Sequence, residues 1–243
     1  MPSPASSVSL VDGSAPVPVC ASNNIIELRQ LLAQRFPHLR SSLAPRARAV
    51  TFPTGIAALD LMLGGGVARG EFTEFVAPGS GSGSTEVIHQ LLRQVAANRQ
   101  FLALVDGTGS FDVCAVEEAV LNRLLWVRCG HAAEALKAMD LLLRDRNFPV
   151  LVLDLKLNPM GELRKITASI WFRYARLLEH NKSVVLVVTP HALVSAAGCR
   201  IYLDSALGIE VLSQSRAELL SGLRFTLLRS AGELGGEVVG KAS

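Results

Sequence analysis

Residues 71–90, EFTEFVAPGSGSGSTEVIHQ, are the stretch that decides the fold. The run 71–76 alternates in polarity and then becomes apolar, as a short buried strand does. Small residues follow at 78–83, and from Thr85 onward apolar residues recur at helical spacing. A strand, a Gly-rich loop and a helix in this order are the setting of a phosphate-binding loop, because backbone N–H groups and the helix N-terminus together attract an anion.

The loop departs from the complete motif, G-x-x-x-x-G-K-[ST], at its charged position. When Gly83 and Thr85 are aligned with the last Gly and the Ser/Thr, Ser84 stands where the Lys belongs and Pro78 stands at the first Gly. The pattern therefore indicates a loop that has the shape of a phosphate site and lacks its charge. A Gly/Ser turn that only joins a strand to a helix is the alternative.

Composition limits the classes of protein that fit. A chain of 243 residues with 49% hydrophobic residues can form one large α/β domain with appendages. The formal charge of +3 permits contact with nucleic acid without arguing strongly for it. The four cysteines have no metal-ligand spacing, and neither a signal peptide nor a membrane span is expected. We therefore expect a protein of the reducing cytoplasm.

The chain is expected to have four parts: a flexible tail at 1–22, an N-terminal helix and linker at 23–49, a core domain at 50–230 and a flexible C-terminal tail at 231–243. The helix at 23–36 is amphipathic, and such a short helix needs a surface on which to bury its apolar face. Leu28 and Leu32 lie on that face and are the candidates for binding a partner protein.

Within the core domain, apolar strands alternate with amphipathic helices. We expect helices at 54–60 (with Thr54 as its cap), 85–98, 113–122, 132–144 and 162–180. We expect strands at 71–76, 101–105, 124–127, 150–155 and 184–188, followed by partly antiparallel strands at 201–203, 209–212 and 225–228. The pattern predicts an α/β fold with a mostly parallel sheet and helices on both faces.

Several short motifs occur in a fixed order around the loop. They are TG…LD at 54–60, LGGG at 63–66, RGE at 69–71, VDGT at 105–108 and Asp154 closing an apolar strand. This order resembles the core of the RecA recombinase family over roughly residues 50–212. The resemblance implies a P-loop NTPase-type core in which Asp154 is similar to the carboxylate on the Mg²⁺ side.

The same resemblance locates three departures. The family has a Lys at Ser84, a catalytic Glu at Thr108 and a Gln that senses the γ-phosphate at about Pro190. Hydrolysis needs positive charge on the γ-phosphate and a residue that positions water. We therefore expect a degenerate ATPase site with no catalytic residue and no bound cofactor. Weak contact with ATP and Mg²⁺ is left open, through Gly79, Gly81, Gly83, Ser84, Thr85 and Asp154.

Among RecA relatives the chain is most similar to the ImuA/SulA-like group. That resemblance implies a non-hydrolysing adaptor in DNA repair and translesion synthesis of the SOS response. Its partners would be a Y-family polymerase-like protein and RecA. Two alternatives are a weak ATPase that binds DNA and takes its cation from a neighbouring subunit, as a homo-oligomer would, and a SulA-like inhibitor of cell division. Weak nucleic-acid contact is expected from Arg46, Arg48, Arg164 and Lys165.

A hydrolase is a further alternative, because the pentapeptide at 79–83 matches G-x-S-x-G. It would need an acid from Asp154 or Asp204 and a base from His180 or His191. The motifs upstream of the loop have no role in such an enzyme, which makes this alternative the weaker one.

Overall fold

The computed structural model describes residues 50–79, 81–208, 211, 213–230 and 238–241, all within one unit, Arg48–Ser243. The predicted tail at 1–22 and the helix and linker at 23–49 lie outside the described residues, and so do Leu28, Leu32, Arg46 and Arg48. Among the described residues, no helix has the length and apolar character needed to span a membrane.

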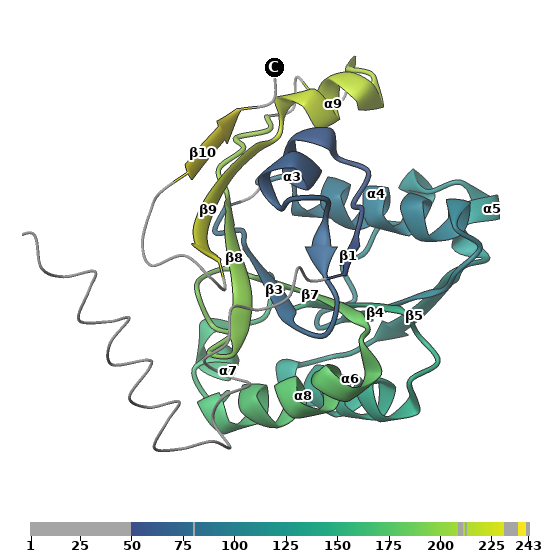
Figure 1. Ribbon diagram of the computed structural model, residues 1–243. Coiled ribbons are helices and arrows are strands. Elements are labelled where there is room, and N and C mark those ends of the chain that lie inside the picture. Colours follow the sequence, from purple (N-terminus) through teal and green to yellow (C-terminus); the bar gives the residue numbers. More distant parts are fainter. Residues whose placement is uncertain (1–49, 80, 209–210, 212, 231–237, 242–243) are drawn as a thin grey trace, which may run out of the picture. The chain divides into compact units, whose positions relative to one another are not determined.

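An eight-stranded sheet forms the centre of the unit (Figure 1). In spatial order its strands are β10 (Val238–Lys241), β9 (Arg224–Ser230), β8 (Ala197–Leu203), β3 (Phe72–Val76), β7 (Val184–Thr189), β6 (Val150–Asp154), β4 (Leu102–Asp106) and β5 (Leu124–Arg128). The strands from β8 to β5 are parallel to one another, whereas β9 and β10 are added in antiparallel pairing. The predicted mostly parallel α/β sheet is confirmed.

Helices cover both faces of this sheet. The helices α3 (Ala57–Met62), α4 (Ser84–Ala97), α5 (Glu118–Leu121) and α9 (Arg216–Gly222) pack on one face, and α6 (Ala132–Asp145), α7 (Met160–Leu163) and α8 (Ala168–Asn181) pack on the other (Figure 1). Two short strands, β1 (Thr51–Phe52) and β2 (Val67–Ala68), form a separate antiparallel pair. A 3₁₀ turn, η2 (Val113–Ala115), precedes α5.

The apolar strands contribute side chains to two hydrophobic cores, one on each face of the sheet. In β6, Val150 and Val152 face the core under α4, whereas Leu151 and Leu153 face the core under α6 and α8. All four side chains are fully buried. Because both faces of a parallel sheet are covered, its strands are continuous apolar runs and not alternating ones.

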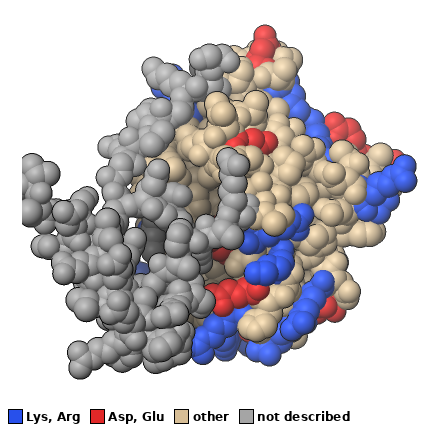
Figure 2. Space-filling view, in the orientation of Figure 1, with Lys and Arg blue, Asp and Glu red and all other residues tan. Residues whose placement is uncertain are grey.

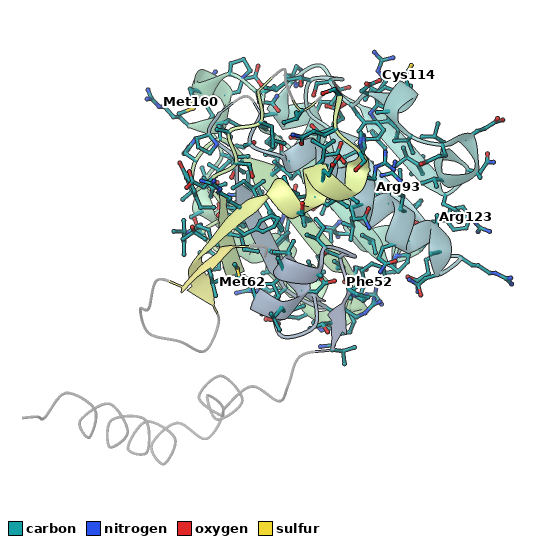
Figure 3. All side chains as sticks on the ribbon, turned by 90° about the horizontal axis from the view of Figure 1, so that it is seen from above. Phe52, Met62, Arg93, Cys114, Arg123 and Met160 are labelled. Carbon is teal, nitrogen blue, oxygen red and sulfur yellow. The ribbon has the colours of Figure 1, made fainter. Side chains whose placement is uncertain are left out.

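Ion pairs connect three helices on the α4 face. Arg93 of α4 lies 3.1 Å from the carboxylate of Glu117, and Glu117 lies 3.2 Å from Arg216 of α9. The side-chain view from above labels Arg93 (Figure 3). Since Glu117 is 58% exposed, this network adds little to stability and mainly fixes how α9 lies against α4.

Two predicted helices are interrupted. The predicted helix at 162–180 is α7 and α8, and Thr167 between them has an extended backbone. The predicted helix at 113–122 is η2 and α5, because Val116 adopts an extended conformation and buries its side chain in the core. Burial of one apolar side chain outweighed helical propensity in the second case.

Other expectations also need correction. Thr54 is not the cap of α3, which has Ile56 at that position without a side-chain cap. Instead, Thr54 Oγ1 accepts from the Ile56 N–H and donates to Asp60 at 2.7 Å. Residues 238–241, expected to belong to a tail, form β10. The predicted strand at 209–212 falls mostly on residues outside the described part, and α9 was not predicted.

Candidate functional site

The candidate site lies at the carboxyl edge of the parallel strands, where β3 leads through the loop into α4. Gly81 and Gly83 have φ values of 70° and 85°, in the left-handed region that favours glycine. Ser82 and Ser84 are buried, with 2% and 3% exposure, whereas Thr85 is exposed. The loop thus turns as a phosphate loop does, but it directs two serine side chains into the protein.

A lysine from the turn after β6 contacts two serines of this loop. Lys156 follows β6, and its Nζ donates to Ser82 Oγ at 2.9 Å and to Ser84 Oγ at 3.1 Å. Ser84 is the position where the motif has its own lysine. The ammonium missing from the loop is therefore supplied from the strand that carries Asp154. Burial lowers the pKa of Lys156, and the nearby Asp154 carboxylate opposes that shift.

Sequence reasoning missed Lys156. The signal that was available is its spacing, two residues beyond the carboxylate that closes a buried strand. Loop and lysine are 74 residues apart in the chain, so only the order of strands in the sheet brings them together.

Two leucines close the loop from the other side. The Leu207 N–H donates to the Gly81 carbonyl at 2.9 Å, and a Cβ added at Gly81 would clash with the Leu207 carbonyl. A Cβ at Gly83 would clash with Leu223. Gly81 requires glycine because the Leu207 backbone approaches it closely, whereas at Gly83 the positive φ favours glycine.

Two carboxylates lie side by side at the same edge. Asp154 and Asp106 are paired in register on neighbouring strands. Burial is the main cause that raises the pKa of Asp154 to about 6; the Asp106 charge adds to it, and the hydrogen bond from the Lys156 N–H, 3.0 Å long, opposes it. The environment of Asp154 therefore disfavours its charged form.

The Asp106 carboxylate holds together the turn that follows β4. It accepts hydrogen bonds from the N–H groups of Gly109 at 2.9 Å and Phe111 at 2.8 Å, and from Trp126 Nε1 at 3.2 Å. The turn contains Thr108, whose side chain is exposed at the position of the family's catalytic Glu. Asp106 therefore has a structural role in this turn.

A buried glutamate anchors the loop after β7, which begins at Pro190. Glu74 of β3 is fully buried and accepts from Thr189 Oγ1, the Leu193 N–H and the Val194 N–H at 3.0, 2.6 and 3.0 Å. Its second oxygen accepts from Arg200 Nε at 2.6 Å. Every oxygen of this buried carboxylate is thus bonded, as a buried charge requires.

The remaining candidates are not brought together into one site. Gly79 is exposed on the loop, and Arg164 and Lys165 are exposed at the bend between α7 and α8. Within the described part of the chain, Ser82 bonds to Lys156 and to no histidine, which removes support for the hydrolase. Across the same residues, no cluster of His, Cys, Asp and Glu could hold a metal ion.

Comparisons with known proteins relate part of the chain to RecA. No family model matches the chain. A protein named Protein RecA from Prochlorococcus marinus strain MIT 9303 is 34% identical over 124 residues, which are 49% of this chain and 32% of that protein. Protein RecA from Nostoc punctiforme is 33% identical over 113 residues, 46% of this chain and 31% of that protein. The match spans about a third of the length of these relatives. Together with the sheet, it supports a RecA-like domain in this chain.

Proposed function

We propose that the protein is a RecA-like accessory protein in bacterial DNA repair, acting in damage-induced translesion synthesis through contacts with other proteins and without hydrolysing ATP. The similarity to RecA supports the setting in DNA repair. The ImuA-like assignment is the finer part of the proposal. Its partners would be a Y-family polymerase-like protein and RecA itself.

The observation that carries the proposal is the contact of Lys156 with Ser82 and Ser84. A phosphate loop that works uses its ammonium and backbone N–H groups to hold a phosphate chain. Here the ammonium is directed to two hydroxyl groups of the loop itself. The contact from Leu207 to Gly81 lies against the same loop. These contacts favour a structural role for the loop over a role in binding phosphate.

The chemistry of the neighbouring residues supports the same conclusion. Thr108 has no carboxylate with which to polarise water, and Pro190 has no amide side chain to contact a γ-phosphate. These two absences remove different requirements of phosphoryl transfer. The pKa of Asp154 is raised to about 6, mainly by burial, so this carboxyl takes up a proton at a higher pH than an ordinary aspartate does.

Phosphate release by the full chain with ATP and Mg²⁺ tests the absence of hydrolysis. The parent protein should release phosphate no faster than the Thr85→Ala variant, which is the matched control for a contaminating ATPase. Turnover of about 1 s⁻¹ or more in the parent, a typical enzymatic rate, that is lost in Thr85→Ala would overturn the proposal and favour the weak ATPase.

The assignment to translesion synthesis has its own test. Purified full chain would be mixed with a purified Y-family polymerase-like protein or RecA from the same organism, and complex formation followed by light scattering. A complex with either protein supports the adaptor role. Binding only to a cell-division protein would replace it by the SulA-like alternative.

A further inference from the structure

A surface groove runs between α6 and α8. It consists of two adjoining hollows of about 320 and 430 Å³, which share Ala133, Leu136 and Ile170. Ile166 extends the apolar wall at one end and Leu141 at the other. Leu141 is 68% exposed, so its side chain is available for contact at that end of the groove. The groove is thus an apolar strip for which the described residues provide no cover.

A hydrogen bond connects the two helices at the floor of the groove. Tyr174 Oη of α8 donates to the Leu136 carbonyl of α6 at 2.7 Å. Arg173 lies over the Tyr174 ring, 5.2 Å from its centroid, and pairs with Asp140 at 3.2 Å. A groove with a bonded floor keeps its shape before a partner arrives, which lowers the entropic cost of binding.

The charge that lines the groove is positive by a small margin, with Lys137, Lys165 and Arg173 against Asp140 and Glu162. Asp140 is paired with Arg144 at 2.7 Å and with Arg173, whereas Glu162 accepts from the Ala132 N–H at 2.8 Å and keeps its charge. Lys137 and Lys165 line opposite ends of the strip, are exposed, and have no ion pair among the described residues. Figure 2 shows Lys and Arg over the region where α6 and α8 lie, with Asp and Glu among them.

We propose that this groove binds an amphipathic helix of a partner protein, with an apolar stripe and acidic residues beside it. From His131 to Leu141 the groove follows α6 for about 15 Å, which matches roughly three turns of a helix. A β-strand fits poorly, because two helices offer no free backbone groups for it to pair with. This inference rests on the proposed adaptor role only in taking the occupant to be another protein.

Charge disfavours two other occupants. The segment at 23–36 of this chain carries two arginines and one glutamate, so its excess charge matches that of the groove. A second copy docked by a twofold axis through this face would place Lys137 and Lys165 of both copies close together, which is repulsive. An acidic helix from another protein has neither difficulty.

The test uses the full chain and a labelled helical peptide of about twelve residues, which spans roughly three turns. Its leucines lie at i, i+3, i+4 and i+7 with glutamates on either side, and a control peptide has lysine in place of each glutamate. Fluorescence anisotropy should show saturable binding of the acidic peptide only. Its affinity should fall roughly tenfold or more between about 50 and about 300 mM salt, since exposed charges are screened.

Variants locate the binding on the groove. Leu141→Glu and the double variant Lys137→Glu/Lys165→Glu should each weaken binding by roughly tenfold or more, because they remove apolar contact or reverse the charge. Leu61→Glu is the matched control, since Leu61 is 85% exposed on α3. It should bind like the parent, and all variants should melt near the parent temperature.

Three results would overturn the inference: no binding of the acidic peptide, equal binding of the lysine peptide, or equal loss in Leu61→Glu. Binding that appears only in Leu28→Glu/Leu32→Glu would assign the groove to this chain's own segment at 23–36. A dimer of the parent that Leu141→Glu dissociates would assign it to a second copy. None of these measurements involves ATP. A negative result would therefore overturn the groove inference without bearing on whether the protein hydrolyses ATP.

Discussion

At the residue scale, the ammonium of Lys156 contacts two serines of the loop after β3. Replacing Lys156 by Met keeps the length of the side chain and removes the donor from two buried hydroxyls. Buried groups that lose a hydrogen-bond partner reduce the free energy of unfolding by about 1–3 kcal/mol. Urea unfolding of the Lys156→Met variant should show a loss of that size. Lys165→Met, at an exposed lysine, should change the value by about 0.5 kcal/mol or less. Equal losses in the two variants would mean that the Lys156 contacts contribute nothing specific.

The carboxyl of Asp154 makes a second residue-scale prediction, on pH. Its pKa is raised from 3.8 to about 6 in the folded chain, mainly by burial. The folded state therefore binds the proton more tightly than the unfolded state, so this group favours folding at low pH and loses that contribution as pH rises from about 4 through 6. Asn has no charge to bury, so the Asp154→Asn variant does not lose stability as pH rises. At pH 7.5 its free energy of unfolding should exceed that of the parent by at most about 3 kcal/mol. Guanidinium unfolding at pH 4 and 7.5 measures both proteins, and a gap that does not widen with pH would contradict the raised pKa.

Residue identity explains which parts of the site could be predicted. The missing charge at Ser84 follows from one local motif, and so does the absence of a carboxylate at Thr108. The replacement by Lys156 does not, because its partner Ser82 is 74 residues away and the contact depends on where β6 lies relative to β3. A single sequence carries no local signal for such a long-range contact.

At the element scale, Glu74 links three elements: β3, β8 through Arg200, and the loop after β7. Glu74→Ala should lower the free energy of unfolding by about 3–5 kcal/mol, because Arg200 is left unpaired and two backbone N–H groups lose their acceptor. The double variant Glu74→Ala/Arg200→Ala should lose less than the sum of the single variants, since neither charge is then left alone. Urea unfolding of the four proteins gives this coupling. Strict additivity would show that the ion pair is not the link.

Periodicity in the sequence predicts that an element exists, whereas packing determines where the element begins and ends. The β4, β6 and β7 strands follow from apolar runs, which are typical of strands buried on both faces. The predicted helices at 113–122 and 162–180 were too long, because an extended Val116 and an extended Thr167 interrupt them. Thr167, at the second break, is exposed. The break at Val116 serves packing between elements far apart in the chain, which helical spacing within one segment does not record. The strand β10 was missed for the same reason, because its register comes from β9.

At the scale of the whole molecule, charge predicts weak binding to DNA. The chain has a formal charge of +3, and among the described residues Arg93, Arg173 and Arg200 are paired with carboxylates. Arg164 and Lys165 remain exposed at one bend between helices and can contact only a few phosphates.

Affinity for single-stranded DNA should therefore be weak, with a dissociation constant of about 1 μM or higher at 150 mM salt. The slope of log K against log salt should correspond to only about two to four phosphates. Arg164→Glu/Lys165→Glu should reduce that slope by about two, whereas Lys137→Glu should leave it nearly unchanged. Anisotropy titrations with a labelled oligonucleotide at several salt concentrations measure both the affinity and the slope. A tight, salt-insensitive complex would require base stacking or a continuous binding surface, and it would place the protein nearer to a recombinase than to an adaptor.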